Sequence, residues 1–200
     1  MTDVDFWFDP ACPWTWITSR WMTEVEHARR LNVTWRTFSL LHHNREGEMP
    51  DQYRKPLVSQ WRGLRVIEAA RAGYGNDAVA ALYTAFGSAI HLRGDASLQS
   101  LASAVDEAGV DPSVLSHADD ESWDHGIRLS TETGSALVGK DVGIPIIGIE
   151  GAKSVFFGPV MSPAPTGDDA VKVWDAYQLL TEVEGVYEIK RTREVGPQFA

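Results

Sequence analysis

Apolar residues in the first 41 positions follow two different periods. The run Val4 to Phe8 is short, aromatic and β-branched, which predicts a buried strand. From Trp14 to about Leu31 the apolar residues recur at helical spacing, and Pro13 suits the first turn of a helix. Val33 to Leu41 is again β-branched and aromatic, which favours a second strand. This order predicts a βαβ unit with two parallel strands.

The middle of the chain has the pattern of several consecutive helices. A polar loop is expected from His42 to about Pro56, and strand signals are then sparse up to position 138. Three apolar stripes at helical spacing mark the block: Leu57, Trp61, Leu64 and Ile67; Val79, Leu82, Phe86 and Ile90; Leu98, Leu101, Ala102 and Val105. A fourth helix is expected from about Glu121 to Leu137. The tryptophans of the whole helical block are expected to be exposed, and they would offer a surface for a homodimer.

Strand signals return after the helical block. Gly143 to Ile149 and Ser154 to Phe157 predict a hairpin, and Asp168 or Asp169 is expected to cap a last helix. The polar tail from Lys190 to Ala200 is expected to be extended or loose. The chain therefore predicts a split α/β fold, with residues 1–56 and 139–200 in one domain and 57–138 as a helical insertion.

Composition narrows the possible functions. The 200 residues carry 18 Lys and Arg against 28 Asp and Glu, a net charge of −10. Without a basic run, this charge disfavours nucleic acids and anionic membranes as partners. No signal-peptide pattern and no apolar stretch of transmembrane length is found, so a cytoplasmic location is expected. With a single cysteine and dispersed histidines, neither a disulfide nor a metal site is expected.

Cys12 is the main candidate for chemistry. It lies between a predicted strand and a predicted helix, at the carboxyl end of the strand, where α/β folds place their sites. Free N–H groups at a helix N-terminus stabilise an anion, so we expect an outward-facing thiol with a lowered pKa. Most lone cysteines are small buried hydrophobic residues, but a position between Pro10 and Pro13 is atypical of that role. The carboxylate of Asp9 would oppose the lowering of the pKa.

Other polar residues are expected near this thiol. Thr15 lies one helical turn beyond Cys12, where its hydroxyl could donate a hydrogen bond to a thiolate or simply pack in the first turn. His42, His43 and Asn44 follow the second strand and so belong to the same end of the sheet, although the residues alone favour a plain polar loop.

These features resemble a known family. The segment Phe8-Asp9-Pro10-Ala11-Cys12-Pro13-Trp14-Thr15-Trp16 is similar to the active-site segment of DsbA-like thioredoxin-fold proteins, in particular the FrnE-like and mycothiol-dependent reductase branch. Val142-Gly143-Ile144-Pro145 resembles their cis-proline loop, and Phe157-Gly158-Pro159-Val160 resembles a short motif that follows their last hairpin. The resemblance implies a thioredoxin-like fold with an all-helical insertion between the second and third strands.

The resemblance also implies roles for single residues. Cys12 would be the attacking thiol and Thr15 would stabilise its thiolate. Pro145 would be cis and lie beside Cys12, and the backbone of Ile144 would pair with a bound thiol. The thiol-binding residues implied are Pro13, Trp14, Asn44, Ile144 and Pro145.

One departure from the family pattern leaves several functions open. Redox members usually carry a second cysteine where this chain has Thr15. The first option is a cytoplasmic monothiol oxidoreductase that uses mycothiol or glutathione as co-substrate to reduce a small-molecule or mixed-disulfide substrate. The second is a transferase or isomerase similar to kappa-class glutathione transferases, in which Cys12 or Thr15 stabilises the thiolate of a bound thiol. The third is a binding module without redox activity.

Overall fold

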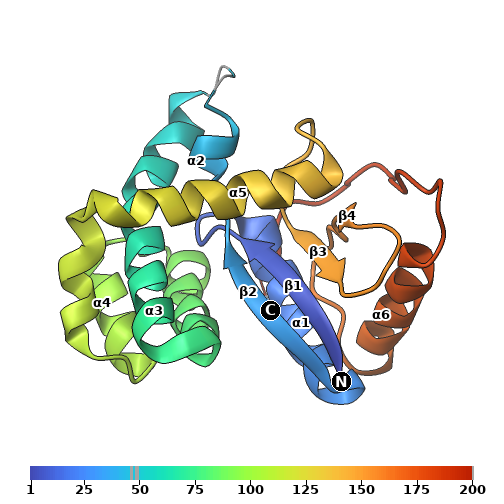
Figure 1. Ribbon diagram of the computed structural model, residues 1–200, viewed down its shortest axis with the longest axis horizontal. Helices are drawn as coiled ribbons and strands as arrows, with labels where there is room; N and C mark the ends of the chain where they lie inside the picture. Colours follow the sequence, from blue (N-terminus) through green and yellow to red (C-terminus); the bar gives the residue numbers. More distant parts are fainter. Residues whose placement is uncertain (46, 48–49, 200) are drawn as a thin grey trace.

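The computed structural model describes residues 1–45, 47 and 50–199, and its centre is a four-stranded sheet (Figure 1). The strand order is β2-β1-β3-β4, formed by Leu31–Thr37, Thr2–Phe8, Ile146–Ile149 and Phe156–Phe157. The β1–β2 pair is parallel, whereas β1–β3 and β3–β4 are antiparallel. This is the predicted βαβ unit followed by a hairpin, and the mixed α/β fold is confirmed.

Two helices pack together beside the sheet. They are α1 (Pro13–Arg29) and α6 (Gly167–Thr181). The indole of Trp21 in α1 donates a 2.9 Å hydrogen bond to the carbonyl of Ala170 in α6. The Tyr177 hydroxyl donates to the carbonyl of Ile147 in β3 at 2.5 Å. Thr166, and not the predicted Asp168 or Asp169, is the N-cap residue of α6, and both aspartates lie in the first turn.

The chain between β2 and β3 is helical. It contains α2 (Leu40–His43), α3 (Asp51–Arg93), α4 (Leu98–Glu107), the 3₁₀ segments Pro112–Asp119 and Glu121–Trp123, and α5 (Asp124–Val138). In Figure 1, α3 and α4 lie to one side of the sheet and α5 crosses in front of it.

Two boundaries, and the exposure of two tryptophans, differ from the prediction. The second strand ends at Thr37, and the residues expected to prolong it to Leu41 begin the short helix α2. The expected polar loop is shorter, because α3 already begins at Asp51; positions 46, 48 and 49 of that loop lie outside the described residues. The tryptophans of the block are not exposed as expected: Trp61 and Trp123 are half-buried, and the Trp61 indole donates to Asp124 at 2.7 Å.

A kink in α3 attaches the helical block to the edge of the sheet. Gly75 has φ 80° and ψ −168°, a conformation that L side chains rarely adopt. The next residue, Asn76, receives a 2.9 Å hydrogen bond from the Trp35 amide and donates one of 2.8 Å to the Val33 carbonyl. An open strand edge invites pairing with another chain, and these contacts occupy the edge of β2.

Aromatic rings join the sheet to the same helix. Tyr83 of α3 stacks on Phe8 of β1 with a centroid distance of 4.0 Å, and it lies 5.9 Å from Trp35 of β2. Phe6 lies 4.9 Å from Trp35. The core is therefore continuous from the sheet into the helical block.

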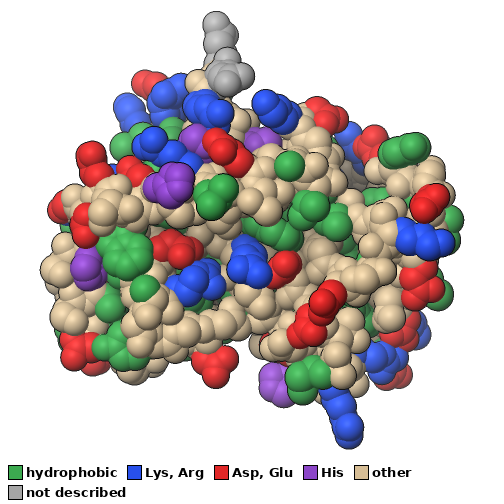
Figure 2. Space-filling model, viewed as in Figure 1, with side chains coloured by type: hydrophobic (Ala, Val, Ile, Leu, Met, Phe, Trp, Pro, Cys, Tyr) green, Lys and Arg blue, Asp and Glu red, His purple; other side chains and the backbone are tan. Residues whose placement is uncertain are grey.

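The surface carries mixed charge. On the face seen in Figure 2, acidic and basic side chains are interspersed. Within the described ranges, no helix combines the length and the apolar character needed to cross a membrane.

Candidate active site

Cys12 lies where β1 passes into α1. It is the N-cap residue of α1. Its amide donates a hydrogen bond to the Asp9 carbonyl at 3.0 Å, and its carbonyl accepts one from the Trp16 amide at 3.0 Å. Pro13 is the first helical residue, where a missing N–H costs no hydrogen bond. The cysteine thus sits at the N-terminus of a helix of 17 residues, as its sequence position predicts.

The thiol is buried, however, and does not face outward as expected. Only 6% of Cys12 is exposed, and it packs in an apolar cluster with Trp7, Phe38, Ile144 and Ile146. Burial raises the pKa of the Cys12 thiol, and the charge of Asp9 adds to this increase. The expected lowering of the pKa is therefore wrong for this conformation, because the loss of hydration outweighs the stabilisation by the helix N-terminus.

Several groups oppose this increase. The Thr15 hydroxyl and the backbone N–H groups of Thr15 and Trp14 each lower the pKa of the thiol. Thr15 is completely buried, and its Oγ1 forms no hydrogen bond of good geometry with any described residue, although it lies close enough to the Cys12 sulfur to stabilise a thiolate there. A buried hydroxyl without a hydrogen-bond acceptor is costly, and a thiolate beside it would accept a hydrogen bond from it. The role of Thr15 as a donor to a thiolate remains a prediction, and this orphan hydroxyl supports it.

Asp9 connects the turn before Cys12 to α2. One carboxylate oxygen accepts a hydrogen bond from the Ala11 amide and the other accepts one from the Leu40 amide, both at 2.9 Å. Asp9 is only 2% exposed, and burial raises its pKa to about 6, although both hydrogen bonds act in the opposite direction. From the sequence, Asp9 was expected only as a charge that opposes a lowered pKa of the Cys12 thiol. The Asp-Pro pair after the strand was the signal for its second role, because aspartate often accepts a backbone N–H two residues further on.

The loop before β3 lies against Cys12. The Ile144–Pro145 peptide is cis, as the resemblance implied, and Ile144 packs in the Cys12 cluster. The Gly158 amide donates a hydrogen bond to the Pro145 carbonyl at 2.8 Å, and the Thr18 hydroxyl donates one to the Pro159 carbonyl at 3.0 Å. The loops before and after the hairpin are thus fixed to each other and to α1.

The backbone polar groups of Ile144 are unpaired among the described residues. Within the part of the chain that the structure describes, neither its N–H nor its C=O forms a hydrogen bond. A peptide-like thiol could pair with both groups as a short antiparallel strand would. The pairing of Ile144 with a bound thiol remains a prediction, and the unpaired N–H and C=O groups support it.

The C-terminal tail reaches this site. It was expected to be extended or loose, and the Arg193 guanidinium lies over the half-buried Trp14 ring, 4.9 Å from its centroid. Ser162 Oγ donates to the Gly196 carbonyl at 2.9 Å and accepts the Gln198 amide at 2.8 Å. The tail therefore has no regular secondary structure but has defined contacts.

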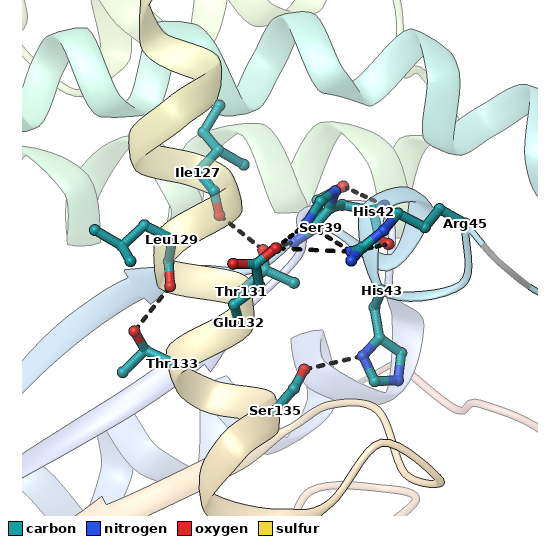
Figure 3. Close-up of polar contacts among 10 residues, drawn as sticks. All are labelled: Ser39, His42, His43, Arg45, Ile127, Leu129, Thr131, Glu132, Thr133 and Ser135. Carbon is teal, nitrogen blue, oxygen red and sulfur yellow. Dashed lines mark hydrogen bonds and ion pairs between the residues drawn. The ribbon is translucent and has the colours of Figure 1, made fainter.

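The residues after β2 form α2 and contact α5 (Figure 3). His42 Nε2 lies 2.9 Å from Glu132 Oε1, and His43 Nδ1 lies 2.9 Å from Ser135 Oγ. Burial lowers the pKa of His43. The Asn44 side chain donates to the Leu40 carbonyl at 2.8 Å and so caps α2. These side chains share the Cys12 end of the sheet, but they are engaged in holding α2 in place.

The sequence indicated no role for His91 near the turn that carries Cys12. Its Nε2 lies 2.8 Å from the Pro10 carbonyl oxygen. No spacing in the sequence links positions 10 and 91, because the contact exists only through the packing of α3 on α1. No cluster of three metal-ligating side chains occurs among the residues that the structure describes.

Comparison with known proteins places the chain in a family. The family model described as "Rv2466c-like: Mycothiol-dependent nitroreductase Rv2466c" matches residues 11–191. The uncharacterized protein Rv2286c of Mycobacterium tuberculosis is 26% identical over 196 residues, which cover 96% of this chain and 83% of that protein.

Solved structures show the same fold. The cytosolic disulfide reductase DsbM from Pseudomonas aeruginosa is similar with a TM-score of 0.60 and 17% identity, covering 89% of this chain and 99% of that one. A structure of DsbM with GSH matches with a TM-score of 0.58 and 15% identity, covering 88% of this chain and 98% of that one. A probable DsbA oxidoreductase from Streptomyces coelicolor matches with a TM-score of 0.58 and 16% identity, covering 97% of this chain and 95% of that one. The fold is DsbA-like and thioredoxin-like.

Proposed function

The chain belongs to the Rv2466c-like family of thiol-dependent oxidoreductases, and we propose that it works with Cys12 as its single redox thiol. The co-substrate is mycothiol or glutathione, and the substrate is a small molecule or a mixed disulfide. The observation that carries the proposal is the setting of Cys12. The thiol sits at a helix N-terminus, beside the orphan hydroxyl of Thr15 and against the cis-proline loop. A cytoplasmic location belongs to the same proposal, because the co-substrate must be kept reduced.

The proposed cycle has two exchange steps. The Cys12 thiolate attacks one sulfur of a disulfide substrate, forms a mixed disulfide with it and releases the other sulfur as a thiolate. A thiolate of the co-substrate then attacks the substrate sulfur of that mixed disulfide, and Cys12 leaves as a thiolate. One substrate disulfide is converted to a free thiol, and the co-substrate ends in a disulfide with the other half of the substrate. No second cysteine is needed.

The residues around Cys12 fit a low-molecular-weight thiol. The Thr15 hydroxyl would donate to the Cys12 thiolate each time that it forms, and the backbone of Ile144 would hold the peptide-like part of the partner. Pro13 and Trp14 would form the adjacent wall, together with Pro145 and with Asn44 at the end of α2. Because the thiol is buried, Trp14 or the cis-proline loop must shift before a disulfide can reach it.

A second function follows from the raised pKa of the thiol. A Cys12 that stays protonated could donate, together with Thr15, to the thiolate of a bound co-substrate, as in a kappa-class-like transferase or isomerase. In that case, Cys12 forms no mixed disulfide during turnover.

Intact-protein mass spectrometry distinguishes the two. We would incubate the protein with mycothiol disulfide and, separately, with glutathione disulfide from pH 5 to pH 10. The monothiol proposal predicts one adduct, absent from Cys12→Ser, that excess thiol removes. Thr15→Val should form the adduct more slowly, because it keeps the shape of threonine and removes the donor. Absence of an adduct at every pH would overturn the monothiol cycle, and thiol conjugation to an electrophile by Cys12→Ser would support the transferase.

A further inference from the structure

His91 contacts the turn that carries Cys12. It lies in the last turns of α3, and its Nε2 is 2.8 Å from the carbonyl oxygen of Pro10. A carbonyl oxygen can only accept a hydrogen bond, so Nε2 must carry the hydrogen and donate the hydrogen bond. The same turn is closed from inside by the Cys12 amide, which donates to the Asp9 carbonyl. The helical block therefore holds the turn two residues before the nucleophile.

Two aromatic rings hold the imidazole. Trp16 of α1 stacks on it at a centroid distance of 5.6 Å and an interplanar angle of 26°. Phe199 of the C-terminal tail lies at 5.4 Å with an angle of 38°. Burial lowers the pKa of His91 to about 4, although the hydrogen bond to Pro10 acts in the opposite direction. At neutral pH the imidazole is therefore an uncharged, oriented donor.

The approach of α3 to this point is unusually close. Gly87 lies one helical turn before His91, on the same face. A Cβ atom at Gly87 would lie 2.3 Å from the Trp16 ring, so only glycine fits here. The position of His91 relative to the Cys12 turn is thus fixed by direct packing of the α3 backbone on α1.

We propose that His91 is a positioning residue for Cys12, and this inference rests on the proposed thiol-exchange function. By holding the Pro10 carbonyl, it fixes the turn that sets the sulfur against the Thr15 hydroxyl and the first N–H groups of α1. Disulfide exchange requires in-line attack on a sulfur–sulfur bond, and small displacements of a reacting group cost orders of magnitude in rate. The imidazole does not touch the reacting sulfur and takes no part in proton transfer.

Two substitutions separate the hydrogen bond from the stacking. His91→Gln keeps an amide donor close to the position of Nε2 but removes the ring. His91→Phe keeps a ring between Trp16 and Phe199 but removes the donor. If His91 only fills space, the phenylalanine variant is the better substitute. If it positions the turn, the glutamine variant is the better one.

The measurement is the rate of mixed-disulfide formation between Cys12 and glutathione disulfide, at a pH where the rate no longer increases. We expect His91→Phe to react roughly tenfold more slowly than the unaltered protein, the effect of one lost hydrogen bond. We expect His91→Gln to stay within about threefold of the unaltered rate. Thermal unfolding of both variants is measured in parallel. Equal losses that follow the unfolding temperature, or an unaltered rate in His91→Phe, would overturn the proposal.

Alkylation of Cys12 by iodoacetamide keeps this test independent of the proposed function. Its pH profile reports the environment of the thiol whether or not a disulfide is the substrate. We expect the midpoint to move by at least about half a pH unit in His91→Phe, because the freed turn changes the hydration of the sulfur, and to stay in place in His91→Gln. If the unaltered protein reacts with neither mycothiol disulfide nor glutathione disulfide, the thiol-exchange function fails, and this alkylation profile alone shows whether His91 positions Cys12. Superimposable profiles in all three proteins would refute the positioning role.

Discussion

Replacing Asp9 by asparagine should change how the stability of this protein depends on pH. Asparagine has nearly the same shape as aspartate but cannot ionise. It can accept only one of the two amides that Asp9 binds, so it loses one hydrogen bond to Ala11 or Leu40. That loss is the same at every pH. Any difference between the two proteins that varies with pH therefore reports the ionisation of Asp9.

The size of this difference follows from the pKa. Burial raises the pKa of Asp9 from 3.8 to about 6 in the folded chain. Because the folded value is the higher one, the stabilisation is complete below the unfolded pKa and is lost as the pH rises through the folded pKa. About two pKa units correspond to roughly 2–3 kcal/mol at 1.36 kcal/mol per unit. The free energy of unfolding of the unaltered protein, relative to Asp9→Asn, should fall by that amount between about pH 4 and pH 7.

Urea denaturation across this pH range measures the difference. Asp5→Asn is the matched control, because Asp5 lies in β1 a few residues before Asp9 and its partly exposed carboxylate pairs with Arg36 at the surface. Its difference curve should stay flat within about 1 kcal/mol, the usual limit for a surface ion pair. Asp9→Asn should also lower the midpoint of Cys12 alkylation, because the charge of Asp9 raises the pKa of that thiol. A flat difference curve for Asp9→Asn would show that its carboxylate ionises as easily as an exposed one, and the reasoning would fail.

Three further substitutions test the packing around the site by the free energy of unfolding. Gly87→Ala should cost at least about 2 kcal/mol because its methyl group meets the Trp16 ring, whereas Gly73→Ala in the same helix has open space and should be neutral or stabilising. Thr18→Val should cost about 1–2 kcal/mol and speed Cys12 alkylation, because the Pro159 carbonyl loses its donor; equal stability would contradict this. Asn76→Ala should cost roughly 2 kcal/mol through its two bonds to β2, and a loss below about 0.5 kcal/mol would show that water replaces them.

The sequence by itself determined the order of elements and the position of Cys12, the proposed nucleophile. Period-2 and period-3.6 patterns are local, and they identified the βαβ unit, the helical block and the final hairpin. A lone cysteine between a strand and a helix that begins at Pro13 is also a local signal. The cis peptide before Pro145 came from the resemblance, since the residues alone left it open, and the structure confirmed it.

Local sequence patterns did not predict where the second strand ends or in which direction the pKa of the Cys12 thiol is shifted. The segment after Thr37 has residues typical of a strand, but Ser39 accepts the His42 amide and begins α2 instead. The helix N-terminus beside Cys12 suggested a lowered pKa. The opposing burial comes from Ile144 and from Phe38, which are distant in sequence. No reading of the segment around Cys12 could include their effect.

Only the tertiary structure brought distant segments to the turn before Cys12. His91 is 81 positions from Pro10, and the tail reaches back to Trp14 and His91. Such contacts depend on how whole helices pack, which hydrophobic periodicity does not encode beyond the buried face of each helix. The place of Cys12 at a helix N-terminus could therefore be predicted from the sequence, whereas its burial, its pKa and its contacts were decided by the packing of α3, the cis-proline loop and the tail around it.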